Sequence, residues 1–233
     1  MLSNRFVTFV RGTIAASLVL AGLPASAQIS GGTRNHEPAG DQSALIAAAK
    51  AEFPSVLAKA LSSESIAAML QVIKETPATG PGLTDFDDVS APCDFVGTSA
   101  LRGVEQFASF SAPGTSGGAI LNECSNFGVN AYSSPNFLAF NRTLAYSASG
   151  VPKTPELILV GPNRSTVTFY ASGGAKSGYP LGIVALGPSG VIGMQTITTS
   201  STWVQVTVTG TGISAIGLVG DPYWLVVDNI QAQ

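Results

Sequence analysis

The sequence has 233 residues, of which 11% are charged and 45% hydrophobic, and it contains 26 Gly and 14 Pro. This composition argues against a disordered acidic or basic protein. Its 11 Lys and Arg, outnumbered by 14 Asp and Glu, argue against binding to nucleic-acid phosphates, which requires clustered cations. One His and two Cys leave few groups for transition-metal binding or His-based catalysis. The length suits one or two domains.

The first 27 residues have the features of a secretory signal peptide. Arg5 and Arg11 give a positive start, residues 13–23 are mostly apolar, and Ala25-Ser26-Ala27 is a small-residue cleavage signal. The apolar run is too short to span about 30 Å of hydrocarbon, which argues against a membrane anchor. We therefore predict cleavage after Ala27 and a secreted or periplasmic product whose mature chain has no membrane span.

Export would place the two cysteines in an oxidising compartment, where disulfides form. A zinc site is the alternative for Cys93 and Cys124, but two Cys without a nearby His cannot supply four ligands. We predict a disulfide between them, worth about 3–4 kcal/mol in the chain-entropy model.

The chain after the signal peptide changes composition along its length. Residues 28–40 are polar and rich in turn formers, which predicts a flexible entry. Residues 41–75 are rich in Ala, Leu, Lys and Glu and contain no Gly, which indicates a helical segment. Residues 76–83 (TPATGPGL) contain helix breakers and are typical of a linker. The rest of the chain, residues 84–233, is predicted to form one β domain.

We expect three short helices in the helical segment. The first runs over residues 41–52, the second opens at Pro54 and runs to Leu61, and the third is capped by Ser62 or Ser63. Short amphipathic helices are marginal alone and need a partner surface. They either form a small hairpin or dock on the domain that follows.

Residues 84–233 follow a period-two pattern. Val204, Val206 and Val208 alternate with Gln205 and Thr207, as expected for a strand with one buried face. Gly, Pro, Ser and Asn clusters separate many such runs, which predicts an antiparallel sandwich or barrel. The expected strands include residues 157–160, 166–171, 182–186, 192–198, 203–209, 215–219 and 224–230.

Two kinds of hydrolase were considered. Gly114-Thr115-Ser116-Gly117-Gly118 resembles the nucleophile loop of trypsin-like serine proteases, but the sole His, His36, lies in the flexible entry and in no similar motif. A glycoside hydrolase needs two carboxylates facing each other across a sugar. Several acids in the β domain leave that pairing open, but nothing supports it. We predict a protein that is not an enzyme, with a carboxylate-dependent glycoside hydrolase as a less favoured alternative.

Three short motifs occur in order along the β domain: TDFDDV at 84–89, SPNFLAFN at 134–141 and WLVVDNI at 224–230. Together they resemble secreted bacterial β-sandwiches of the galactose-binding-like, carbohydrate-binding-module jelly-roll type. The resemblance covers residues 84–230. It implies a mainly β fold, a two-sheet antiparallel jelly-roll β-sandwich preceded here by the short helical segment. It also implies non-catalytic binding of a glycan or of the cell-envelope surface, and structural calcium in many relatives.

The ends of the β domain offer a candidate calcium site. In a jelly roll of this kind the first and last strands lie close together, so Asp87 or Asp88 is expected to approach Asp228. Like charges held together need a counterion, and calcium takes carboxylate, amide and carbonyl oxygens. Asp87 and Asp88 point to opposite sides of a strand, so at most one is an inward ligand. The alternative is that all three acids cap strand ends and face water.

Sugar binding needs aromatic rings that stack on apolar sugar faces and amides that bind hydroxyls. We select Tyr132, Tyr179 and Trp203 as the rings and Asn136 as the amide. Trp203 has the opposite parity to the valines that follow it, so it faces solvent if they face the core. The alternatives are that Trp203 packs against the helices or a loop, and that Tyr179 covers the sandwich edge. The aromatic candidates in the β domain are Tyr132, Tyr170, Tyr179, Trp203 and Trp224.

A second function remains open at this stage. The chain is alternatively a structural or adhesion protein that binds another protein through its sandwich or its N-terminal helices.

Overall fold

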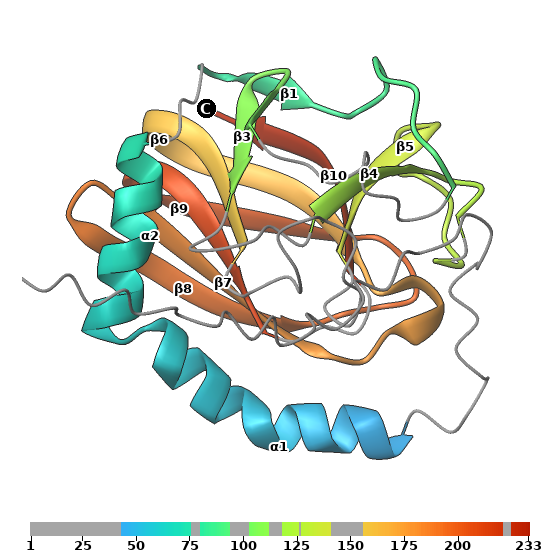
Figure 1. Ribbon diagram of the computed structural model, residues 1–233, viewed down its shortest axis with the longest axis horizontal. Helices are drawn as coiled ribbons and strands as arrows, with labels where there is room; N and C mark the ends of the chain where they lie inside the picture. Colours follow the sequence, from blue (N-terminus) through green and yellow to red (C-terminus); the bar gives the residue numbers. More distant parts are fainter. Residues whose placement is uncertain are drawn as a thin grey trace, which may run out of the picture.

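The computed structural model describes residues 43–75, 80–93, 103–111, 118–125, 127–140, 156–220 and 225–233. Within them, two helices precede a run of antiparallel strands (Figure 1). The helices are α1 (Ser43–Ala60) and α2 (Ser63–Glu75), and the strands are β1 (Gly82–Thr84), β2 (Gly103–Glu105), β3 (Ala108–Ser111), β4 (Gly118–Asn122), β5 (Asn136–Phe140), β6 (Glu156–Ser172), β7 (Pro180–Gly187), β8 (Gly190–Thr198), β9 (Val204–Val219) and β10 (Leu225–Ala232), with the 3-10 turn η2 (Gly174–Lys176) between β6 and β7.

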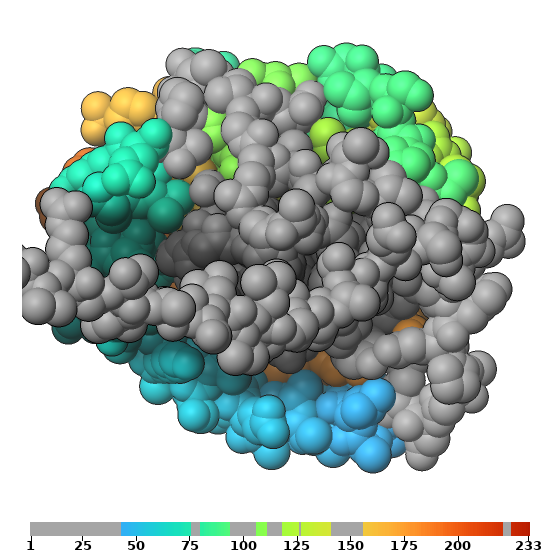
Figure 2. Space-filling model, viewed as in Figure 1, coloured from blue at the N-terminus to red at the C-terminus, as the bar shows by residue number. Residues whose placement is uncertain are grey.

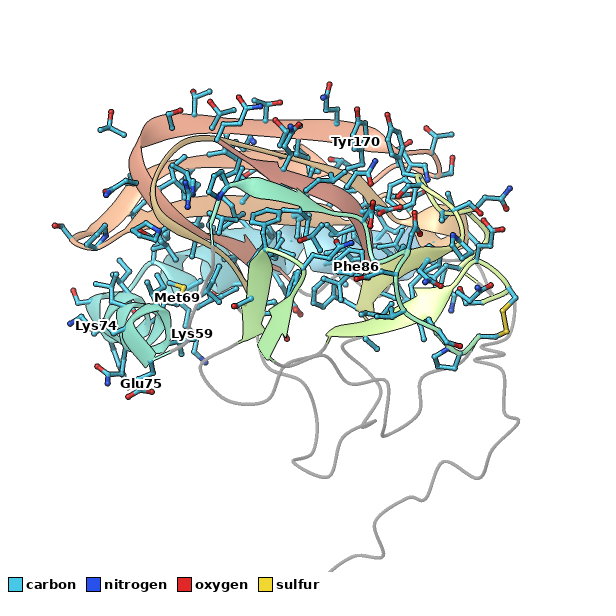
Figure 3. The ribbon with its side chains drawn as sticks, turned by 90° about the horizontal axis from the view of Figure 1, so that it is seen from above. Lys59, Met69, Lys74, Glu75, Phe86 and Tyr170 are labelled. Carbon is cyan, nitrogen blue, oxygen red and sulfur yellow. A yellow bond between two sulfur atoms is a disulfide. The ribbon has the colours of Figure 1, made fainter. Side chains whose placement is uncertain are left out.

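The strands form one hydrogen-bonded sheet that curls into two facing layers. Its order is β4-β5-β10-β6-β9-β7-β8, with β1 added beside β10, and β3 beside β6 and β2. In Figure 3, β3, β4 and β5 lie on one side, β6, β9 and β10 on the other, and Phe86 lies between them. The predicted mainly β antiparallel sandwich preceded by a helical segment is confirmed.

Two long strands, β6 and β9, connect the layers. They pair antiparallel, from Glu156 opposite Leu218 to Ala171 opposite Val204. The sequence predicted two shorter strands separated by a turn where the structure has β6, and likewise where it has β9. Both of these predictions were wrong. Gly161, Asn163 and Gly212 have φ values of +81°, +64° and +82°. Such residues allow the strands to bulge and bend there, and the pairing then resumes instead of reversing.

Alternating side chains fill the core between the layers. Val167 and Phe169 on β6 and Val206 and Val208 on β9 are buried, as the period-two pattern predicted. The threonines that alternate with them face outward and are partly or fully exposed. Burying one large apolar side chain stabilises the fold by about 1.5–3 kcal/mol, so this alternation specifies the register of the pair.

The helical segment contains two helices instead of the predicted three. α1 continues through Pro54, because the neighbouring Val56 and Leu57 pack against the sheet and compensate for the lost helical hydrogen bond. Ser62 caps α2, since its Oγ accepts a hydrogen bond from the Ser65 N–H at 3.3 Å. The helices therefore dock on the sheet of the β domain and do not form a separate hairpin. In Figure 2, α1 (blue) lies along the lower edge of the molecule and α2 (teal) on its left.

The helices cover the sheet face opposite the core. Leu157 and Leu159 of β6 and Val184 of β7 are buried beneath them, together with Met69 of α2. No single helix in the described residues is both long and apolar enough to cross a bilayer. α1 and α2 pass such a test only together, across a bend of 66°.

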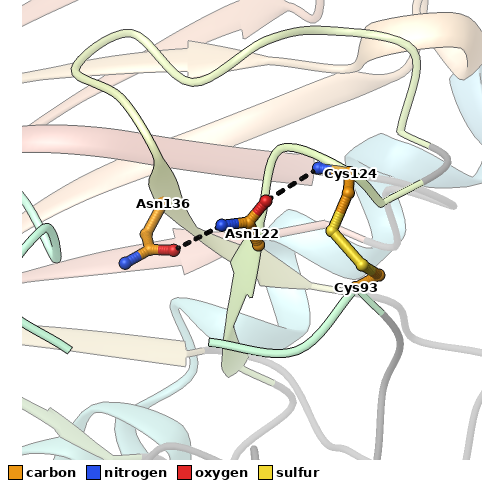
Figure 4. The surroundings of a disulfide bond; sticks show 4 residues. All are labelled: Cys93, Asn122, Cys124 and Asn136. Carbon is orange, nitrogen blue, oxygen red and sulfur yellow. Dashed lines mark hydrogen bonds between the residues drawn. A yellow bond between two sulfur atoms is a disulfide. The ribbon is translucent and has the colours of Figure 1, made fainter. Parts of the chain in front are cut away.

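Cys93 and Cys124 form the predicted disulfide (Figure 4). The Asn122 side-chain oxygen accepts a hydrogen bond from the Cys124 N–H at 3.1 Å, and its amide donates to Asn136 Oδ1 at 3.4 Å. The disulfide and these bonds join the segment after β1 to the ends of β4 and β5. The predicted signal peptide and entry, His36 and residues 114–117 lie outside the described residues.

Docking of α2 can be tested through Met69, which is fully buried. We expect Met69→Ala to lower the free energy of unfolding by about 2–5 kcal/mol, measured by urea denaturation of the full chain. Leu45→Ala, at a residue of α1 that is 48% exposed, is the control and should change it by less than about 0.5 kcal/mol. Equally small effects of both changes would contradict the packing of α2 on the sheet.

Candidate functional site

Three aromatic rings meet on the outer surface of the sandwich. Tyr132 stacks on Tyr170, with ring centroids 3.6 Å apart and planes at 17°. Trp203 meets Tyr132 edge-on, at 6.2 Å and 78°. Tyr132 is 44% exposed, whereas Tyr170 and Trp203 are half-buried. We call Tyr132, Tyr170 and Trp203 the aromatic cluster.

Three separate parts of the fold supply this cluster. Tyr170 lies on the outward face of β6, opposite in parity to the buried Phe169. Trp203 immediately precedes β9, packs against Phe137 of β5, and donates from Nε1 to the Asn130 carbonyl at 2.9 Å. Tyr132 lies in residues 127–135, the segment that leads into β5. The cluster therefore forms only when this segment folds over the outer face of β5 and β10.

Neutral polar side chains adjoin the cluster. Thr168 of β6 and Thr207 of β9 face outward beside Tyr170, and their hydroxyl oxygens are 3.4 Å apart. Gln205, the register partner of Tyr170, is exposed on the same pair of strands. This surface offers hydroxyl and amide groups that can donate and accept hydrogen bonds.

A buried carboxylate holds the segment that carries Tyr132. Asp228 of β10 is fully buried, and its Oδ2 accepts hydrogen bonds from the backbone N–H groups of Tyr132 and Ser133, at 2.9 and 3.0 Å. Its Oδ1 accepts from the Asn229 N–H at 2.7 Å. Burial raises the pKa of Asp228 to about 7, although these three N–H donors favour the ionised form.

Asp87 supports the other end of the same segment. It is half-buried and accepts a hydrogen bond from the Asn136 N–H at 3.2 Å. Burial raises its pKa, and the nearby charges of Asp85 and Asp88 act in the same direction. The charge of Asp87 also raises the pKa of Asp228, so the structure brings these two acids near each other. Asp88 is exposed.

The bonding of Asp228 bears on the predicted calcium. Oδ2 receives two N–H donors and Oδ1 receives one, while the Ser133 hydroxyl donates to Asn229 Oδ1 at 2.8 Å. A carboxylate has about four lone-pair sites, and backbone N–H groups take three of those of Asp228. Among the described residues, no group of three or more His, Cys, Asp or Glu is placed to hold a metal ion. The resemblance implies calcium at Asp87, Asp88 or Asp228, whereas the N–H donors on Asp228 argue against it; the unfolding temperature in calcium and in EDTA separates these two expectations.

The other selected residues occupy different positions from one another. Tyr179 is only 2% exposed and lies beneath α1 with Phe53 and Val56, so its ring is not offered to a dissolved sugar. Asn136 is fully buried, and its amide donates to the carbonyls of Phe86 and Val89, both at 2.8 Å. Tyr179 therefore takes the alternative position, covering an edge of the sandwich, and Asn136, which was selected as a sugar-binding amide, is a structural anchor instead.

Trp203 packs against the segment 127–135. This matches the alternative that its ring packs against a loop, and not the expectation that the ring faces solvent. Tyr132 keeps an exposed ring. Sequence reasoning named Tyr170 as an aromatic candidate but did not select it as a binding residue, and it missed the anchoring role of Asp228. The outward parity of Tyr170 with Thr168 was a usable signal for the first, whereas the second depends on contacts across 96 residues.

No protein-family model and no curated protein matches the sequence. Among solved structures, the chain is similar to the K2 cleaved adhesin domain of Lys-gingipain, with a TM-score of 0.46 and 10% identity, over 65% of this chain and 97% of that one. The chain is also similar to TmCBM61, solved with β-1,4-galactotriose, with a TM-score of 0.38 and 10% identity, over 62% of this chain and 99% of that one. For a xylan-binding domain from CBM 22, the TM-score is 0.35 and the identity 16%, over 67% of this chain and 96% of that one. Likeness at this level carries no argument about a ligand.

The raised pKa of Asp228 predicts a pH-dependent stability. Between about pH 4 and pH 7 the folded state holds a proton that the unfolded state has lost, so stability falls as pH rises through this range. We expect Asp228→Asn to reduce this fall, measured by urea unfolding from pH 4 to pH 8. Asp88→Asn, at an exposed acid, should keep the wild-type profile. A wild-type profile in Asp228→Asn would contradict a buried titrating Asp228.

The bonding of Asp228 also predicts the response to calcium. A ligand that binds only the folded state raises its unfolding temperature. We expect the unfolding temperature of the full chain to be the same in millimolar calcium and in EDTA. A calcium-dependent rise that Asp228→Asn abolishes would restore the predicted metal site.

Proposed function

We propose that this chain is an exported, non-catalytic glycan-binding module whose contact surface is the aromatic cluster. The observation that carries the proposal is the exposed ring of Tyr132, held by stacking on Tyr170 and by the hydrogen bond from its own backbone to Asp228. A ring fixed in this way loses little conformational entropy when a ligand binds.

The surroundings of the ring suit a neutral carbohydrate. Aromatic rings supply an apolar face for the C–H groups of a sugar, and the outward Thr168, Thr207 and Gln205 supply partners for its hydroxyls. The pKa of the Tyr132 hydroxyl is raised, first by a hydrogen bond with Tyr170, which ties this phenol to the ring on which it stacks.

The same geometry argues against hydrolysis at this site. A glycosidase needs two carboxyl groups that reach the sugar. Asp228 is fully buried, and its oxygens bind backbone N–H groups. Asp87 likewise binds the Asn136 backbone. Both carboxylates hold the segment 127–135 instead of facing a ligand.

One observation favours protein binding as a second candidate function. β8 lies at one end of the sheet order and exposes three large apolar side chains, Val191, Ile192 and Met194, the last of them 50% exposed. Exposed apolar side chains grouped together are typical of protein contacts.

The proposal is tested by calorimetry of the full chain against a panel of neutral soluble polysaccharides. For a glycan that binds, we expect Tyr132→Ala to weaken affinity about tenfold or more, since loss of about 1.4 kcal/mol of stacking is tenfold. Tyr132→Phe keeps the ring and should retain most of the affinity.

Met194→Ala, at an exposed residue of β8, is the matched control and should bind like the wild type. Trp203 fluorescence, measured in a Trp224→Phe background because the sequence has a second Trp, reports independently whether the cluster is intact. Failure of the folded chain to bind any glycan, or equal binding by Tyr132→Ala, would reject the proposal and favour protein binding through β8.

A further inference from the structure

A second concave site lies on the side of the molecule away from the aromatic cluster. A pocket of about 290 Å³ separates α2 from the bend of the sheet. Leu70 and Ile73 of α2 and Leu159 and Pro162 of β6 make it predominantly apolar, and Lys74 and Ser214 add polar groups.

The bend in β6 and β9 accounts for this space. Pairing between the two strands is regular up to Leu159 and shifts in register before Arg164. Here the sheet turns away from α2, whose last turn ends at Glu75. The helix covers Leu159, which is 1% exposed, and the pocket lies beside it, where β6 bends past Gly161 and Pro162.

The charges at this place are positive. Lys74 lines the pocket, and it forms no ion pair with the part of the chain that the structure describes. The Arg164 guanidinium lies against Gly161, a further residue of the wall, and its Nε donates to the Val160 carbonyl at 2.9 Å. None of the described residues lining the pocket is Asp or Glu.

A buried hydroxyl is unsatisfied in the same wall. Ser214 is 6% exposed, and its Oγ has no hydrogen-bond partner among the described residues. Leaving such a group unpaired costs about 1–3 kcal/mol. Ser214 and Lys74 both line the pocket. A ligand with an anionic acceptor would pair with this hydroxyl and with the ammonium group.

We propose that this pocket binds a medium-chain fatty acid, with its alkyl chain against the apolar wall and its carboxylate between Ser214 and Lys74. The volume is about twice that of a 150 Å³ cavity that holds benzene, so it accepts about ten to twelve non-hydrogen atoms. Octanoate and decanoate have this size. The site shares no side chain with the aromatic cluster, so it goes beyond the proposed function.

The test is titration of the full chain with decanoate below its micellar concentration, followed by NMR or calorimetry. We expect saturable binding. Leu70→Phe, which adds volume inside the pocket, should weaken both decanoate and decan-1-ol at least tenfold. Lys74→Gln should weaken decanoate about fivefold and leave decan-1-ol unchanged, because only the carboxylate meets the ammonium.

Lys50→Gln, at an exposed lysine of α1, is the matched charge control and should bind both ligands like the wild type. Lys74→Gln changes an exposed side chain, so it tests the proposal even if Leu70→Phe does not fold. The proposal is overturned by absence of saturable decanoate binding, or by binding that neither variant alters. Co-sedimentation with phosphatidylcholine vesicles in the absence of binding to free decanoate would also overturn it and indicate a membrane lipid as the source of the acyl chain.

Discussion

The antiparallel pairing of β6 with β9 is the constraint on which the rest of this structure depends. In one half of the pair, consecutive residues such as Ile158 and Leu159 are all buried, because the core takes one face and the helices take the other. In the other half, only alternate residues such as Val167 and Phe169 are buried. The bend between the halves separates a sheet face that is covered by helices from one that is open to solvent.

The open half becomes a defined surface through buried charge. Desolvating Asp228 is costly, and the cost is offset by the backbone N–H groups of Tyr132, Ser133 and Asn229 that it accepts. Those bonds are available only if residues 127–135 lie over β10. The carboxylate therefore selects one position for the segment, and that position brings Tyr132 onto Tyr170. The buried carboxylate of Asp228 thus fixes the position of an exposed aromatic ring in a chain that has few charged residues.

Sequence reasoning reached the elements whose information is local. The alternation around Val206 predicts the strand and its buried face, and the serines at 62 and 63 predict the start of α2, where the structure shows Ser62 as the cap. It failed where the same local signal serves two outcomes: Gly161 and Gly212 are turn formers, but here neighbouring strands keep the chain extended through a bulge. The aromatic cluster could not be predicted from the sequence, because its contacts follow from packing and not from any local pattern. Trp203, for example, contacts Asn130 across 73 residues.

The aromatic cluster and the apolar pocket differ in chemistry because different elements lie next to β6 on the two sides of its bend. On one side of it, Tyr170 faces outward among neutral hydroxyl and amide groups, and a loop supplies the second ring. On the other, Leu159 is buried beneath α2, and an apolar pocket with Lys74 in its lining lies beside the helix. β6 carries both sites but shares no side chain between them. Substitutions at one should therefore have additive effects with substitutions at the other, since distant sites without common partners act independently.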